Sequence, residues 1–208
     1  MDTKFRAKIA NIYSSLADIT AKEASVINEM IDFVQDVDSI AKKVNSLESD
    51  ADIIVHTSAL EIREAGLQLD EESNDYYKII LLFEECTDVI EDLAIAYNSF
   101  NVTSLREDYI PMLVSVEQAA QSLVGLASAM RNPKKVGPIQ LSIIDINHSR
   151  DVGVKMYSDS MKNLFTYEKD PIEIVRWKEI YTLTRDVFVA YEDVADACEE
   201  FILRYSIK

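Results

Sequence analysis

Apolar residues recur along the chain at three- and four-residue intervals, which is the period of an amphipathic α-helix and not of a β-strand. The clearest example follows Asp170 and Pro171 and continues almost to the end of the chain. Asp170 suits the N-cap of a helix, Pro171 its first position, and Glu173 the acid that satisfies first-turn amides. We therefore expect a last helix over 171–206.

Breaks elsewhere divide the rest of the chain into long segments. Helix-incompatible residues gather at 70–74, 101–103 and 132–138, and Thr20 with Glu23 has the spacing of a capping box. The expected helices span 3–34, 38–69, 75–99, 104–131, 138–167 and 171–206. Pro111 either occupies the first turn of the fourth helix or kinks it. The fold class is all-α, with six long helices forming two antiparallel three-helix bundles.

The two halves of the sequence also match each other. With an offset of 101, Leu82 falls on Leu183, and the segment 91–94 (EDLA) falls on 192–195 (EDVA). An offset of 99 puts Asp52 on Asp151. Both offsets are close to half of the chain. We therefore expect an internal repeat of about 100 residues, over approximately 1–102 and 103–208, within a single helical domain spanning 1–208.

The charge of the chain excludes several functions. There are 37 acids against 21 bases among 208 residues, a net charge of −16, with only four glycines and four prolines. Binding to nucleic acid or anionic lipid depends on an excess of Lys and Arg, so neither is expected. The longest apolar run, Ile79 to Phe83, is far shorter than a membrane span, and Cys86 and Cys198 suit reduced core positions. A cytoplasmic protein is expected.

Two acidic pairs lie one helical turn apart. Glu48 and Asp52 fall in the second expected helix, and Glu84 and Asp88 fall in the third, where Asp92 extends the row. Residues four apart share a helix face, so such carboxylates repel each other unless a cation bridges them. If the two faces pack together, their oxygens could hold a divalent or ferric ion. His56, one turn beyond Asp52, could add a nitrogen ligand.

Spacing alone does not establish such a site. With 37 acids in 208 residues, about seven acidic pairs at this spacing are expected by chance, and seven occur. A solvated acidic face therefore remains the alternative. Enzyme motifs are also missing from the sequence: it has no Gly-rich phosphate loop, no GxSxG and no HExxH. A ferritin-like di-iron centre needs two Glu-x-x-His motifs, but Ile53 precedes His56 and Asp145 precedes His148 at that spacing.

Three segments resemble the PhoU-like phosphate transport regulators, in particular the accessory proteins of Pit-type phosphate permeases. The most specific segment is 170–181 (DPIEIVRWKEIY) together with 191–199 (YEDVADACE); the others are 47–56 (LESDADIIVH) and 74–92. The resemblance implies a non-enzymatic regulator built from two repeated three-helix bundles. It also implies E/D-x-x-x-D motifs on the second and third helix of each half, which bind iron or another transition metal.

Carried over to this chain, the metal motifs differ between the halves. The first half keeps both motifs, as Glu48 with Asp52 and Glu84 with Asp88, with His56 and Asp92 as peripheral candidates. In the second half Asn147 precedes Asp151, and the last-helix motif falls on Arg185 and Val189. We expect the second-half site to be lost, with Arg185 replacing the missing cation beside Asp151. The first half would bind iron, zinc or nickel.

The sequence therefore predicts a regulator or accessory protein of inorganic phosphate transport that acts by protein binding. Its partner would be a phosphate permease or a signalling protein, it would reach the membrane only peripherally through that partner, and it would form a homo-oligomer. The alternative is a metal-independent helical scaffold or oligomerisation protein derived from the same fold.

Overall fold

The chain is helical throughout most of its length. The computed structural model describes residues 3–64 and 71–205, and these residues contain no strand. The helices are α1 (Thr3–Asn28), α2 (Met30–Phe33), the 3-10 turn η1 (Val34–Asp36), α3 (Val37–Glu64), α4 (Glu71–Ser99), α5 (Ile110–Ala129), α6 (Val136–Tyr167) and α7 (Pro171–Tyr205). The expected all-α class is confirmed.

Several helix boundaries differ from those that the sequence predicts. The segment expected as one helix over 3–34 ends at Asn28 and continues through α2 and η1. The fourth helix begins at Ile110 and not at 104, so that Pro111 occupies its first turn and does not kink it. Asn101, with a positive φ of 48°, ends the turn after α4. The ends expected at 69 and 206 lie outside the described residues.

The start of α7 follows the local signals in the sequence. The Asp170 carboxylate accepts a hydrogen bond from the Ile172 amide at 2.8 Å, as an N-cap residue does. Glu173 pairs with Arg176 on the next turn. The N-cap prediction is confirmed, and the first-turn acid acts through a side-chain partner.

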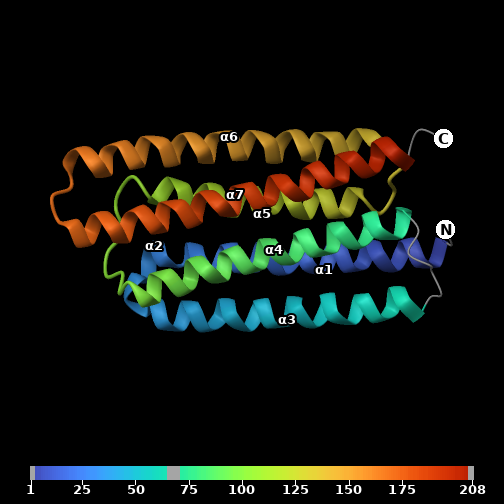
Figure 1. Cartoon of the computed structure of the whole chain (residues 1–208), viewed down its shortest axis with the longest axis horizontal. Helices are drawn as coiled ribbons and strands as arrows, with labels where there is room; N and C mark the ends of the chain where they lie inside the picture. The colour runs from blue at the N-terminus through green and yellow to red at the C-terminus, as the bar shows by residue number, and fades with distance from the viewer. Residues whose placement is uncertain (1–2, 65–70, 206–208) are drawn as a thin grey trace.

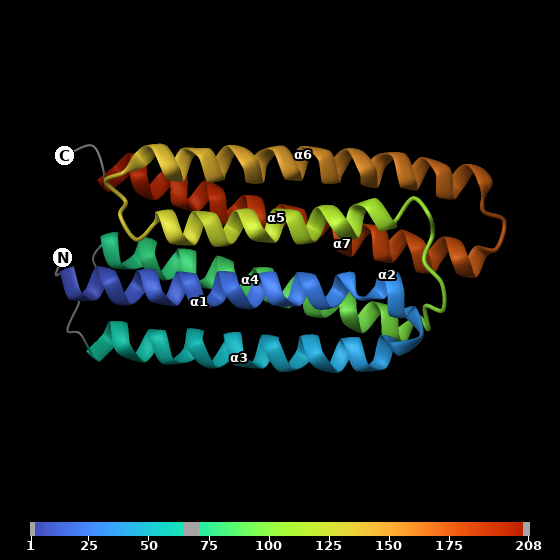
Figure 2. The ribbon, with the colours of Figure 1, turned by 180° about the vertical axis from the view of Figure 1, so that it is seen from behind.

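The helices form an elongated bundle in which each half keeps its own contacts. Helices α1, α3 and α4 contact one another, as do α5, α6 and α7, while α4 packs along α7 and α1 packs along α5. Figure 1 shows α4 beside α7, with α3 and α6 at opposite edges, and Figure 2 shows α1 beside α5 from behind. The buried residues of both halves therefore form one continuous hydrophobic core.

Helix α5 is the most apolar element of the fold. By length and composition alone it is the one helix of the described residues that could cross a membrane, which the search for uninterrupted apolar runs missed. In the structure it contacts α1, α6 and α7, and eight of its side chains are buried in the protein interior. Its central position in the core accounts for its hydrophobicity.

Candidate functional site

The acids of the first half meet where α3 and α4 pack together. Asp52 lies opposite Glu84, close enough for the two carboxyl groups to interact. Burial, the neighbouring Asp52 carboxyl group and the charge of Asp88 raise the pKa of Glu84 to about 7. One turn along, burial and the charges of Glu85 and Glu48 raise the pKa of Asp88 to about 6. The predicted motifs therefore face each other.

Glu48 completes this group from α3. Its pKa is raised by burial and then by the charges of Glu91 and Asp52, against a hydrogen bond from Ser49. Glu91 is held by Asn45, whose amide donates to it at 2.5 Å. We define the acidic face as Glu48, Asp52, Glu84, Asp88 and Glu91. Its members repel one another, and the described residues supply no Lys or Arg partner for them in any ion pair.

The two peripheral candidates lie at the margin of the acidic face. His56 is 79% exposed, and its Nε2 is 3.8 Å from the Asp52 carboxylate, so it makes one loose contact with the group. Asp92 is exposed to solvent. Neither side chain is held in place by the fold. Both remain candidates only, at the edge of the group.

Glu23, on α1, is the residue that the sequence analysis missed. It is 0% exposed, and neither of its carboxylate oxygens has a hydrogen-bond partner. Burial, followed by the charges of Glu48, Glu91 and Asp88 in that order, raises its pKa to about 10. A sixth carboxyl group, fully buried and contributed by a third helix, α1, therefore lies near the acidic face.

The expected capping box of Thr20 and Glu23 is wrong. Both residues lie inside α1, and the Thr20 hydroxyl donates to the carbonyl of Leu16 at 3.0 Å, one turn back within the helix. The useful signal was their place on the apolar stripe of that helix, between Ala17 and Ala24. An acid on a buried stripe lies in the interior whatever motif it completes.

Two further polar groups lie near Glu23. The Tyr191 hydroxyl, from α7, is buried without a hydrogen-bond partner, and the charge of Glu23 contributes to its raised pKa after burial and Cys86. The Cys86 thiol lies within hydrogen-bond distance of two carbonyls, that of Leu82 one turn back at 3.2 Å and that of Ala190 on α7 at 3.5 Å. Burial raises the pKa of that thiol, which keeps it protonated.

In the second half, acidic side chains pair with arginines. Asp151 is 75% exposed and pairs with Arg150 at 3.1 Å, and Arg150 also lies 2.9 Å from Glu192 on α7. Arg185 pairs with Asp186 at 2.5 Å. The expectation that Arg185 would pair with Asp151 is therefore wrong: Arg150, next to Asp151 in the sequence, takes that role.

Arg185 instead lies over an aromatic ring. Its guanidinium is 4.9 Å from the centre of the Tyr157 ring on α6, within the range of a cation–π contact. Asn147 is partly buried, its amide oxygen has no hydrogen-bond partner, and Val189 adds an apolar side chain to the same region. These residues cannot act as a set of carboxylate ligands.

The donor chemistry of the first half fits a hard cation, although its geometry is not preassembled. Carboxylate oxygens suit divalent and ferric ions, and Glu23 adds a buried oxygen pair with no other partner. Yet within 3–64 and 71–205 no three His, Cys, Asp or Glu side chains are arranged as a metal site. A bound cation would therefore require the exposed carboxylates to turn toward it.

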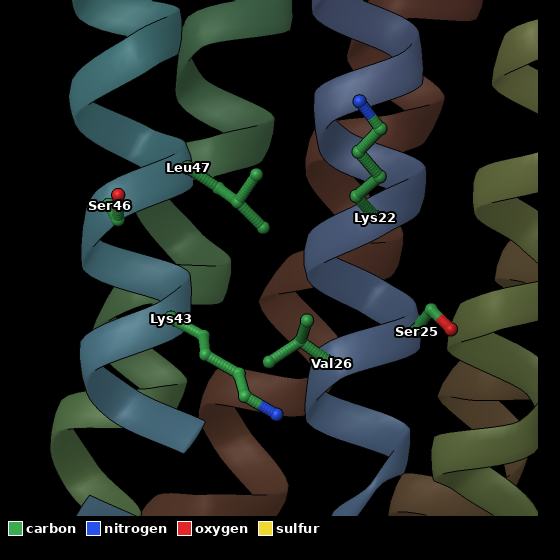
Figure 3. Close-up of a pocket in the computed structure, with 6 residues that line it drawn as sticks. All are labelled: Lys22, Ser25, Val26, Lys43, Ser46 and Leu47. Carbon is green, nitrogen blue, oxygen red and sulfur yellow. The ribbon is translucent and has the colours of Figure 1, made fainter. Parts of the chain in front are cut away.

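A surface groove runs between α1 and α3, separate from the acidic face. Figure 3 shows its lining residues, which are Lys22, Ser25, Val26, Lys43, Ser46 and Leu47. The ammonium groups of Lys22 and Lys43 point away from each other, and Lys43 is already paired with Glu29 at 2.6 Å. The two cations do not converge on a common ligand position.

Comparison with known proteins supports the resemblance that the last helix indicates. No family model matches the chain. The UPF0111 protein YkaA of Bacillus subtilis (strain 168) is 24% identical over 175 residues, covering 79% of each protein. A crystal structure described as a PhoU-like phosphate regulatory protein from Shewanella oneidensis MR-1 superposes with a TM-score of 0.75 at 13% identity, covering 94% of this chain and 99% of that one. The chain therefore has the PhoU-like fold, and its resemblance to PhoU-like proteins is confirmed.

Proposed function

We propose that this protein is a non-enzymatic regulator or accessory protein of inorganic phosphate transport. The observation that carries the proposal is the shared fold, which covers 94% of this chain and 99% of a protein described as a PhoU-like phosphate regulator. The last-helix segment 170–181 supports it, because this is the most specific part of the resemblance. The protein acts by binding a phosphate permease or a signalling protein.

Its surface supports this mode of action. A net charge of −16 disfavours direct adsorption to anionic lipid or nucleic acid, so contact with the membrane is peripheral and passes through the partner. The protein acts in the cytoplasm as a homo-oligomer. It acts by binding its partner protein and not by catalysing a reaction.

Deletion in the native host tests the proposal. We expect phosphate uptake or phosphate-responsive expression to change, and the wild-type gene to restore it. A second arm isolates the partner by crosslinking in cells grown with high and low phosphate. If both phosphate uptake and phosphate-responsive expression are unchanged in the deletion strain, the proposal is wrong.

A transition-metal ion, iron, zinc or nickel, is proposed for the first half, with Glu48, Asp52, Glu84 and Asp88 as ligands. The support is electrostatic: the pKa of Glu84 is raised to about 7 and that of Asp88 to about 6 by burial and by like charges, which a cation would relieve. Elemental analysis of protein purified without a histidine tag tests it. Metal that is present in the wild type and absent from Glu48→Gln with Asp88→Asn supports the site, and metal-free wild type rejects it.

A metal-independent scaffold is the second candidate function, and the second half favours it. There Arg150 lies within ion-pair distance of both Asp151 and Glu192, so a side chain of the same protein supplies a cation in that half. Light scattering after size exclusion distinguishes the two. A discrete oligomer whose melting temperature does not respond to added cations supports the scaffold, because ligands that bind the native state raise that temperature.

A further inference from the structure

The side chain of Glu23 has no structural role that the structure reveals. It is fully buried in α1, both carboxylate oxygens lack hydrogen-bond partners, and it lies close enough to Glu48, Glu91 and Asp88 to feel their charges. Buried polar groups are almost always paired, because an unpaired one loses its hydration without compensation. A bound ligand of opposite charge would stabilise an unpaired acid that faces other acids.

The second half shows that a bundle of this type does not need an acid at this position. The buried stripe of α1 has the same spacing as that of α5 when the two are aligned by burial: residues 16, 17, 20, 23, 24 and 27 then correspond to 112, 113, 116, 119, 120 and 123, an offset of 96 against the 99 and 101 of the sequence repeat. In this correspondence Val116 replaces Thr20 and Ala119 replaces Glu23. The apolar version packs equally deeply, so packing alone does not account for Glu23.

We propose that Glu23 is the inner ligand of a divalent-cation site between α1, α3 and α4, with Glu48 and Asp88 as its outer ligands. This deepens the metal site proposed above and rests on it, and it adds a third helix to the two that carry the acidic pairs. Its donors are carboxylate oxygens alone, which favour a hard ion, and Mn²⁺ serves as the probe for such an ion.

The three carboxylates contribute unequally to such a site. Burial holds the Glu23 side chain in one place, whereas Glu48 is partly buried and Asp88 is exposed, so these two can turn toward an ion. This explains why no three acids in the described part of the chain stand in metal-binding geometry beforehand. The bound ion would give Glu23 its missing partner and would tie α1 to the other two helices.

The test compares Mn²⁺ binding by the full chain and its variants after treatment with chelator, using titration calorimetry and thermal melting. Glu23→Gln keeps the shape of the side chain and removes its ability to ionise and bind a cation as a carboxylate. Asp50→Asn is the matched control, because it removes one charge from an exposed position of α3 between Glu48 and Asp52. We expect Glu23→Gln to weaken Mn²⁺ binding by roughly tenfold or more, and Asp50→Asn to change it little.

Melting without metal separates a ligand from a structural residue. We expect metal-free Glu23→Gln to melt no lower than the wild type, while its increase in melting temperature with Mn²⁺ shrinks. If Glu23→Gln binds Mn²⁺ like the wild type but Asp88→Asn does not, the α1 ligand is rejected and the metal site stands. If the wild type binds no Mn²⁺, this site is rejected, whereas the role in phosphate transport still depends on the deletion strain.

Discussion

The two halves of the molecule place their charges in opposite ways at equivalent positions. In the first half, Glu84 faces Asp52 across α3 and α4, and burial together with this acidic neighbour raises the pKa of Glu84 to about 7. In the second half, Arg185, which follows Glu84 by 101 positions, faces the Tyr157 ring across α6 and α7. A repulsive contact between two acids corresponds to an attractive contact between a cation and a ring.

The same contrast continues along the helices. Glu91 is held by the neutral amide of Asn45, whereas Glu192, 101 positions later, lies 2.9 Å from the guanidinium of Arg150. Below the acidic face lies Glu23, whose counterpart on the apolar stripe of α5 is Ala119. Arg150 thus offsets part of the negative charge in the second half, although burial and neighbouring acids still raise the pKa of Glu192, whereas the described residues give the acidic face of the first half no Lys or Arg partner.

Moving the buried acid to the other half should give the largest effect. Ala119→Glu places a carboxyl group on a buried stripe with no partner and no space, so we expect the free energy of unfolding to fall by about 3–5 kcal/mol. Urea denaturation measures it. Gln121→Glu, an exposed site on the same helix, is the control and should change stability by less than about 0.5 kcal/mol. Equal effects of the two variants would mean that the second half accommodates a buried acid.

The acidic face should make the metal-free protein less stable at high pH. The folded-state pKa values of Glu84, about 7, and Asp88, about 6, lie above their ordinary values of 4.5 and 3.8. Between each pair of values the folded state binds more protons than the unfolded state, so stability falls as the pH rises through this window. Because both groups are partly exposed, we expect these two to account for only about 2 kcal/mol of the stability lost between pH 5 and pH 8, and the buried Glu23, whose pKa is raised to about 10, adds to that loss.

The double variant Glu84→Gln with Asp88→Asn isolates this contribution. Urea denaturation at both pH values, after treatment with chelator, should show a smaller loss between pH 5 and pH 8 than in the wild type. If the double variant keeps the full loss, the pH dependence arises elsewhere in the chain.

The sequence predicted the features that depend only on residues close together in the chain. The N-cap at Asp170 needs only the residues around it, and the pairing of the acidic face follows from four-residue spacing on antiparallel helices. Glu23 escaped because the Thr-x-x-Glu pattern signals a cap only where a helix begins, and the preceding residues of α1 are already helical. Its burial depends on α3 and α4, which the pattern does not contain.

The sequence also could not predict which partner a long side chain contacts. The internal offset placed Arg185 near Asp151, yet a long side chain pairs with whichever acid its rotamer meets, and Arg185 meets Asp186 while Arg150 meets Asp151. The offset places Arg185 and Val189 at the positions of the acidic motif, and the loss of a second-half metal site stays a prediction. It could not identify the residue that replaced the cation.

Packing between the helices gives a smaller difference. Gly153 on α6 lies against Phe188 on α7, and a Cβ atom added at Gly153 would overlap the Phe188 ring. Gly153→Ala should lower the free energy of unfolding by about 1–2 kcal/mol, since overpacking outweighs the gain in helix propensity. Gly137→Ala, at the start of α6, has open space around its new methyl group and should be neutral or slightly stabilising. Equal results at the two sites would show that α6 and α7 can separate without cost.

Removing the Arg150 cation should leave the acids of the second half without an arginine partner, as in the first half. Arg150→Gln leaves Glu192 beside Asp196, Asp151 and Asp193, whose charges together with burial already raise its pKa against the opposing effect of Arg150. The pair with Arg150 is partly buried, so we expect a loss of about 1 kcal/mol at pH 7 and a further rise in the pKa of Glu192. Lys155→Gln, which breaks an exposed pair with Asp159 on the same helix, is the control and should cost less than about 0.5 kcal/mol.

Titration of Glu192 by NMR in the Arg150→Gln variant tests whether Arg150 stabilises the Glu192 carboxylate. A raised pKa of Glu192 means that Arg150 stabilises the carboxylate in the second half, as a proton or a bound ion would in the first half. An unchanged pKa means that Arg150 does not stabilise this carboxylate.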